Sequence, residues 1–108
     1  MMFSLFTTVK TKVLKFKVSY HRFFEGDVVV VWVNKKAIQP AHAKATLDFL
    51  QKHFKKHNVV IASADHDKKP IFVSRGSWAS KFYKHTFEEF TWYTYTIELK
   101  DEKKPFGF

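Results

Sequence analysis

Residues 28–33 read Val28-Val29-Val30-Val31-Trp32-Val33, an apolar run that lacks the polar alternation of a half-buried strand. β-Branched side chains favour extended backbone, and a strand that is apolar on both faces belongs in the middle of a sheet covered on both sides. The run begins after Gly26-Asp27 and ends at Asn34. We therefore expect a central strand around which the rest of the domain is built.

The segment before this run predicts its hairpin partner. Every second side chain is apolar from residue 14 onward, at Leu14, Phe16, Val18 and Tyr20. A period of two indicates a strand with one buried face. Glu25-Gly26-Asp27 has the composition of a turn, so the two strands should pair in a hairpin.

The segments after the run predict two helices and three more strands. Pro40 can begin an amphipathic helix that reaches about His57, because apolar residues follow at spacings of 3 and 4. Strands are expected at 59–64, 71–75 and 93–99, with a second helix from Ser77 to about Phe90. The fold class predicted is α+β in the order ββαββαβ: an antiparallel sheet with two helices on one face, a variant of the ferredoxin-like arrangement.

Length and composition indicate one domain over residues 1–108, with 101–108 as a charged tail that can be flexible. Hydrophobic residues make up 45% of the chain and there is no cysteine, which excludes disulfides and thiolate zinc sites. We interpret residues 1–9 as a strand rather than a signal peptide. No apolar run is long enough to span a membrane, so we expect a cytoplasmic protein with no membrane partner.

Positive charge is the strongest functional signal. The chain has 19 Lys and Arg against 10 Asp and Glu, a formal net charge of +9, and residues 1–24 contain no acid at all. Such asymmetry predicts a basic face, although net charge also serves solubility. The basic residues expected to bind nucleic acid are those in the acid-poor segments: Lys15, Lys17, Arg22, Lys52, Lys55, Lys56, Arg75, Lys81 and Lys84.

The function predicted is non-enzymatic binding of nucleic acid, with RNA or single strands preferred over duplex DNA. Lysine and arginine would contact phosphates, and flat rings would stack on unpaired bases. The candidate rings are Trp78, Tyr83, Trp92, Tyr93 and Tyr95. Each ring can equally be part of the core, because a small domain needs bulky side chains to fill its interior.

The segment Arg75-Gly76-Ser77-Trp78 is the best local candidate for a phosphate contact. A glycine before a helix, with a serine hydroxyl and flanking cations, can offer backbone N–H groups to an anion. The alternative is an ordinary helix start capped by Ser77.

Histidines could suggest metal or catalytic sites, but neither is predicted. His53 and His57 are four residues apart on the expected helix, yet the lysines between them disfavour a bound cation. We therefore expect no metal and no cofactor. A metal-independent ribonuclease using His42, His66, His85 and Arg75 is a second alternative, although nothing in their spacing makes them converge.

The first alternative function is a protein that binds a host protein, such as an inhibitor or adaptor from a phage or other mobile element. Aromatic and arginine side chains also form the energetic centres of protein interfaces. Such a protein could bind a nucleic-acid-processing enzyme together with its RNA. A homodimer through an exposed edge strand or the apolar chain ends is compatible with either reading.

Overall fold

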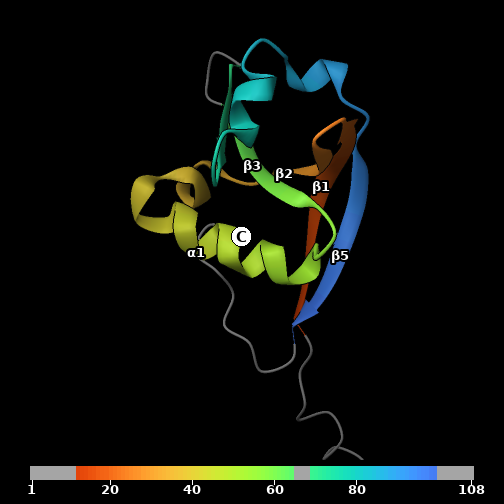
Figure 1. Cartoon of the computed structure of the whole chain (residues 1–108). Helices are drawn as coiled ribbons and strands as arrows, with labels where there is room; N and C mark the ends of the chain where they lie inside the picture. The colour runs from red at the N-terminus through yellow and green to blue at the C-terminus, as the bar shows by residue number, and fades with distance from the viewer. Residues whose placement is uncertain (1–11, 65–68, 100–108) are drawn as a thin grey trace, which may run out of the picture.

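The computed structural model of the protein describes residues 12–64 and 69–99 (Figure 1). The strand expected at residues 1–9, the tail at 101–108 and His66 lie outside the described residues. Within them, no helix is long and apolar enough to cross a membrane.

The described part of the chain forms a five-stranded mixed sheet with one α-helix and three short 3-10 helices. In chain order the elements are β1 (Lys12–Phe23), β2 (Gly26–Trp32), η2 (Lys35–Ile38), α1 (Pro40–His53), β3 (Asn58–Ala64), β4 (Pro70–Ser74), η3 (Trp78–Phe82), η4 (Phe87–Glu89) and β5 (Tyr93–Leu99). The strands lie in the order β4-β3-β2-β1-β5. The α+β class and the five strands are confirmed, but the sheet is not wholly antiparallel. Strands β2 and β3, which α1 connects in the sequence, pair in parallel.

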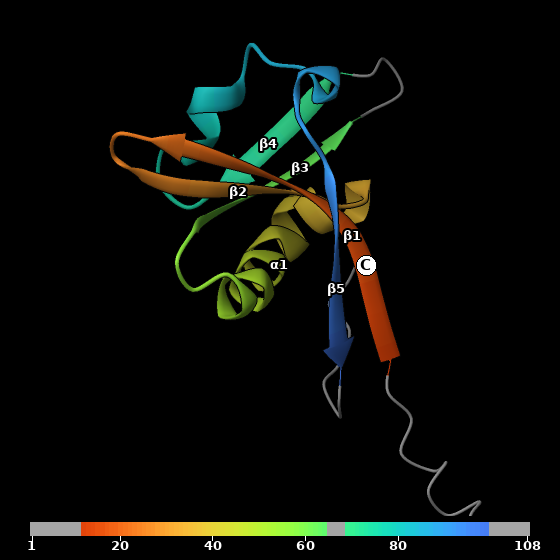
Figure 2. The same ribbon diagram turned by 90° about the vertical axis from the view of Figure 1, so that its right-hand side faces the viewer.

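Strand β2 is buried on both faces, as its composition predicts. Val29 and Val31 pack in one cluster with α1, whereas Val28 and Val30 pack in a second cluster on the opposite face. All four side chains are 0% exposed. The sheet is therefore covered on both faces. Figure 2 shows α1 on one side and, on the other, the segment that carries η3 and η4, residues 78–92, which we call the second layer.

Helix α1 begins at Pro40, as expected, but ends at His53 rather than at about His57. Phe54 leaves the helical region, with φ −120° and ψ 67°, and its side chain is buried against the sheet. Burial of that ring turns the chain toward β3, and residues 54–57 form a turn instead of a last helical turn.

The helix expected from Ser77 to Phe90 is wrong. The segment instead forms η3 and η4, separated by Thr86 in extended backbone at φ −110° and ψ 162°. Its aromatic side chains pack against β2, β3 and β4 from the face opposite α1, with Phe82 only 2% exposed. Aromatic packing decides the conformation here, since helix propensity is a weak constraint. With one main helix, the likeness to a ferredoxin-like domain is only loose.

We predict that Phe82→Ala lowers the free energy of unfolding by about 3–5 kcal/mol, because it removes a buried ring from the second cluster and leaves a cavity. Phe24→Ala is the matched control, since Phe24 lies in the turn between β1 and β2 and is fully exposed. It should change stability by less than about 0.5 kcal/mol. Urea unfolding measures the stability of both variants. Equal stability would contradict the packing of Phe82 between the 78–92 segment and the sheet.

Candidate nucleic-acid interface

A basic, aromatic groove lies where α1 ends, between the turn that follows it and strands β1 and β5. Its volume is about 480 Å³. The residues that line it are Tyr20, Lys52, His53, Phe54, Lys55, Lys56, His57 and Tyr95. The groove therefore brings together the last turn of α1, the following turn and the ends of two strands from distant parts of the sequence.

One side chain holds the lysine-bearing turn in place. The Gln51 side-chain amide donates hydrogen bonds to the carbonyl oxygens of Phe54 and His57, both at 2.8 Å. Both carbonyls lie beyond the last helical residue, and the Phe54 carbonyl also accepts a hydrogen bond from the His57 N–H at 3.2 Å. Lys55 and Lys56 lie between the two bonded carbonyls and are exposed. Gln51 thus orders the backbone that displays the two lysines.

Tyr20 and Tyr95 form the strand side of the groove, and Tyr93 lies beside Tyr20 in an adjoining hollow that Glu89 also lines. The Tyr20 ring lies 5.4 Å from the His57 ring and 6.1 Å from the Tyr93 ring, between centroids. Tyr20 and Tyr93 are 44% and 55% exposed, whereas Tyr95 packs on Phe54 at 4.6 Å. Partial burial, with a smaller effect of Tyr95, raises the pKa of Tyr20 above its usual value, so its hydroxyl stays protonated at neutral pH.

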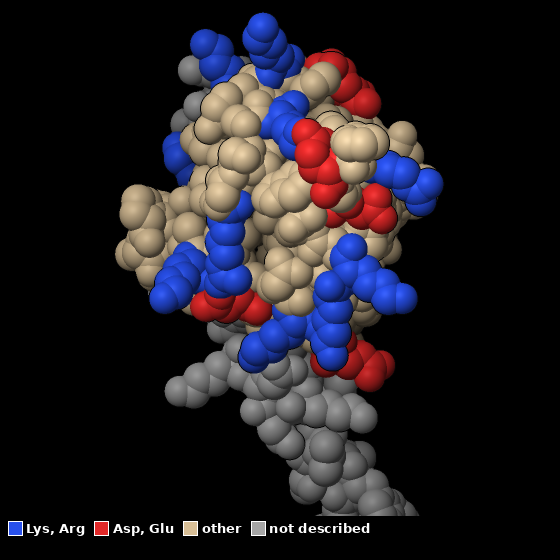
Figure 3. Space-filling model, in the orientation of Figure 1, with Lys and Arg blue, Asp and Glu red and all other residues tan. Residues whose placement is uncertain are grey.

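The charge around the groove is positive, but it is not one continuous basic face. Among residues 12–64 and 69–99, no acidic side chain lines the groove. Arg22, beyond Tyr20 on β1, contacts Asp27 through its Nε at 3.5 Å, and both side chains are exposed. Figure 3 shows Lys and Arg along the lower part of this view, with acidic side chains among them there as well as higher on the molecule. The predicted basic face is therefore divided into smaller patches.

The nine predicted basic residues do not form one site. Lys52, Lys55 and Lys56 line the groove, and Arg22 lines a smaller hollow that shares Tyr20 and His57 with it. Lys15 and Lys17 are exposed on β1, but they alternate with Leu14, Phe16 and Val18, which face α1. The sheet consequently separates these two lysines from the groove.

Two other predicted cations are paired with acids. Arg75 forms an ion pair with Asp48 of α1. Lys81 forms one with Glu25 at 3.2 Å, and its Nζ also lies 4.9 Å from the centre of the Phe23 ring. Each of these cations therefore has an acid beside it, as Arg22 does, and the nucleic-acid contacts expected of them stay predictions.

The segment after Arg75 is not a phosphate loop on a helix. Gly76 has a positive φ of 67°, and the helix that follows, η3, has only five residues. Ser77 does not cap it: the N–H of Ala79 bonds to the Ser74 hydroxyl at 2.8 Å instead. Of the two expectations for this segment, the Ser77 cap is not formed, whereas the phosphate contact stays a prediction.

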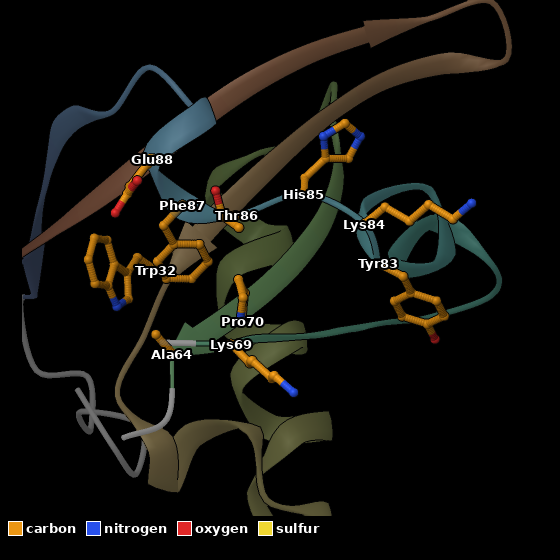
Figure 4. A pocket seen from close by; sticks show the side chains of 10 residues that line it. All are labelled: Trp32, Ala64, Lys69, Pro70, Tyr83, Lys84, His85, Thr86, Phe87 and Glu88. Carbon is orange, nitrogen blue, oxygen red and sulfur yellow. The ribbon is translucent and has the colours of Figure 1, made fainter. Parts of the chain in front are cut away.

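Lys84, the last of the nine, borders a different and larger cavity of about 810 Å³ between the second layer and the ends of β2 and β4. Figure 4 shows Trp32 and Phe87 together on one side of it, with Tyr83 and Lys84 across from them. Glu88 also lines it. This cavity holds fewer of the predicted basic residues than the groove does.

The histidines are distributed over separate sites. His53 ends α1 and His57 lies beyond it, so they do not share a helix face as a zinc-binding pair would. Among residues 12–64 and 69–99, no group of three His, Asp or Glu side chains is placed to hold a metal ion. His42 lies in the first turn of α1, whereas His85 lies in the second layer, so the ribonuclease set does not converge on Arg75.

His21 and His85 lie near each other in the second layer. The Ser19 hydroxyl lies 3.0 Å from His21 Nε2, and His85 Nδ1 lies 3.0 Å from a Glu89 carboxylate oxygen. Burial, with a smaller contribution from His85, lowers the pKa of His21 below its usual value. The Thr86 N–H donates to Glu89 at 2.7 Å and, together with His85, lowers the pKa of Glu89.

The sequence did not indicate two members of the groove. Tyr20 continues the alternation of Leu14, Phe16 and Val18 and was therefore expected on the buried face. It is exposed because α1 does not reach that far along β1. His57 was expected on the helix, and only the early stop of α1 turns it toward Tyr20.

No protein-family model, curated protein or solved structure matches this chain.

We predict that His21 titrates below about 6.5, the usual value for histidine. As the pH falls below about 6.5, the His21 side chain is protonated in the unfolded chain before it is protonated in the native state. The contribution of His21 to stability is therefore fully present above about pH 6.5 and decreases as the pH falls through the folded-state value. The NMR shift of its Cε1 proton against pH tests this, and a midpoint at or above 6.5 would contradict it.

Proposed function

We propose that this protein binds single-stranded nucleic acid in the groove at the end of α1. The observation that carries the proposal is the exposed Tyr20 ring beside three lysines, in a groove that no acidic side chain of the described residues lines. The exposed Tyr93 ring lies 6.1 Å from the Tyr20 ring, just outside the groove. Phosphates would lie against Lys52, Lys55 and Lys56, and unpaired bases would stack on the rings. RNA and single strands are favoured over duplex DNA because bases must be unstacked to reach the rings.

The arrangement also gives Lys15 and Lys17 a lesser role. They lie across the sheet from the groove, so they would add to the overall attraction for a polyanion without touching the bound segment. This difference makes the two lysine pairs a matched test, because reversing either pair removes the same charge from a chain of formal charge +9.

We predict that Lys55→Glu/Lys56→Glu weakens binding of a single-stranded oligonucleotide much more than Lys15→Glu/Lys17→Glu. For single strands, each phosphate contact contributes about 0.7 to the slope of log K against log salt. The groove variant should lose about 1.4 of that slope, and the control should keep it. Fluorescence anisotropy over a range of salt concentrations measures both.

Equal losses of slope in the two variants would show that net charge, rather than the groove, attracts the ligand. Absence of binding to labelled RNA or DNA by the wild-type protein at low salt would contradict the proposed function altogether. Capture from a lysate of a partner that survives nuclease treatment, together with that absence, would favour the alternative of a protein partner.

We predict that Tyr93→Ser weakens single-strand binding roughly tenfold, whereas Tyr93→Phe leaves it nearly unchanged. A stacked base gains about 1–3 kcal/mol from an aromatic ring, and phenylalanine keeps the ring. Tyr83→Ser is the control, since Tyr83 is 70% exposed but lies in the second layer. Anisotropy titrations compare the three variants, and equal weakening by Tyr93→Ser and Tyr83→Ser would count against a ring-specific contact.

A further inference from the structure

We propose that the tip of the β1–β2 hairpin is the outer end of the same binding site: Phe24 stacks on a base, and Arg22 binds a phosphate between that base and the groove. This inference rests on the proposed function. It adds a contact residue, Phe24, that makes no packing contribution to the domain.

Phe24 is the most exposed large apolar side chain of the described residues, at 105% of its reference area. A scattered apolar side chain on a surface is ordinary, but full exposure of a phenylalanine in a tight two-residue turn is costly in water. Turns of this kind favour small polar residues. A ligand that covers the ring would recover the free energy lost by its hydration.

The residues on either side of the hairpin turn pack against neighbouring elements. Phe23, the preceding residue, pairs with Gly26 and packs its ring against Phe82 at 5.7 Å. A side chain at Gly26 would meet the Asn58 amide at 3.2 Å and the Trp78 ring at 3.4 Å, so the backbone approaches both closely. Such preorganisation reduces the entropy lost on binding. Figure 2 shows the hairpin projecting beyond the neighbouring strands.

The tip continues the line of the groove. Tyr20 and Arg22 are two residues apart on β1 and therefore lie on the same face of the strand. Both line a small hollow with His57, next to the groove. The strand rises about 3.3 Å per residue, so Tyr20 and Phe24 are separated by roughly 13 Å along the hairpin. Tyr20, Arg22 and the turn residue Phe24 therefore follow one another along the hairpin.

Charge at the tip is balanced: Arg22 pairs with Asp27, which lines the same hollow, and Lys81 pairs with Glu25. The Arg22 side chain is 89% exposed and contacts Asp27 through Nε at 3.5 Å, an exposed pair of little net strength. Glu25, the other residue of the turn, is drawn toward η3 by Lys81. Glu25, the acid next to Phe24 in the sequence, is therefore paired with Lys81 on the face of the hairpin that packs against the second layer.

The test compares oligouridylates of three and nine nucleotides with the full chain, by NMR titration. Phe24→Ala should leave the affinity for the trinucleotide, which the groove rings alone can hold, within about twofold. It should weaken binding of the nonanucleotide roughly tenfold, the effect of losing one stacked base. Tyr83→Ala is the matched control and should weaken neither. Phe24→Ala needs no correction for stability, because the wild-type ring is fully exposed.

Each other outcome overturns the proposal in a distinguishable way. Binding of both oligomers with no effect of Phe24→Ala would remove the hairpin tip from the site and leave the groove intact. A failure of the wild-type protein to bind either oligomer would remove the proposed function and this extension with it. If Phe24→Ala weakened binding to vesicles of anionic lipid more than binding to the nonanucleotide, the tip would be a lipid contact instead.

Discussion

Burial of β2 on both faces is the constraint on which the rest of the structure depends. Four consecutive valines are removed from water only if one layer covers each side of the sheet. Helix α1 covers one side and returns the chain so that β3 pairs in parallel with β2, while the aromatic segment 78–92 covers the other. The groove exists because α1 ends at His53, before it covers Tyr20 in the later half of β1.

The sequence predicted most of the sheet because strand periodicity is a local signal. Five strands and the start of α1 follow from alternation, apolar runs and Pro40. The end of α1 and the form of segment 77–90 did not follow, since buried rings at Phe54 and Phe82 decide them through contacts across the sheet. Local propensity is easily overridden by such packing.

The candidate site was predicted only in part, for the same reason. Lys52, Lys55 and Lys56 are adjacent in sequence and stay together. Arg75 and Lys81 pair with acids elsewhere in the chain, and Lys81 is 56 residues from its partner Glu25, so composition could not reveal either contact. Tyr20 and His57 meet only because α1 ends early. What emerges is a smaller basic site than the charge of the whole chain suggested, with rings at its centre and a hairpin at its edge.

The most direct measurement is an NMR map of the protein titrated with a single-stranded oligouridylate. The account predicts that the largest shift changes fall on Tyr20, Lys55, Lys56, His57 and Tyr93, around the end of α1. Residues across the sheet, such as Lys15 and Lys17, should change little. Changes concentrated at Trp32 and Lys84, or spread evenly over all exposed lysines, would contradict the assignment of the groove as the nucleic-acid site.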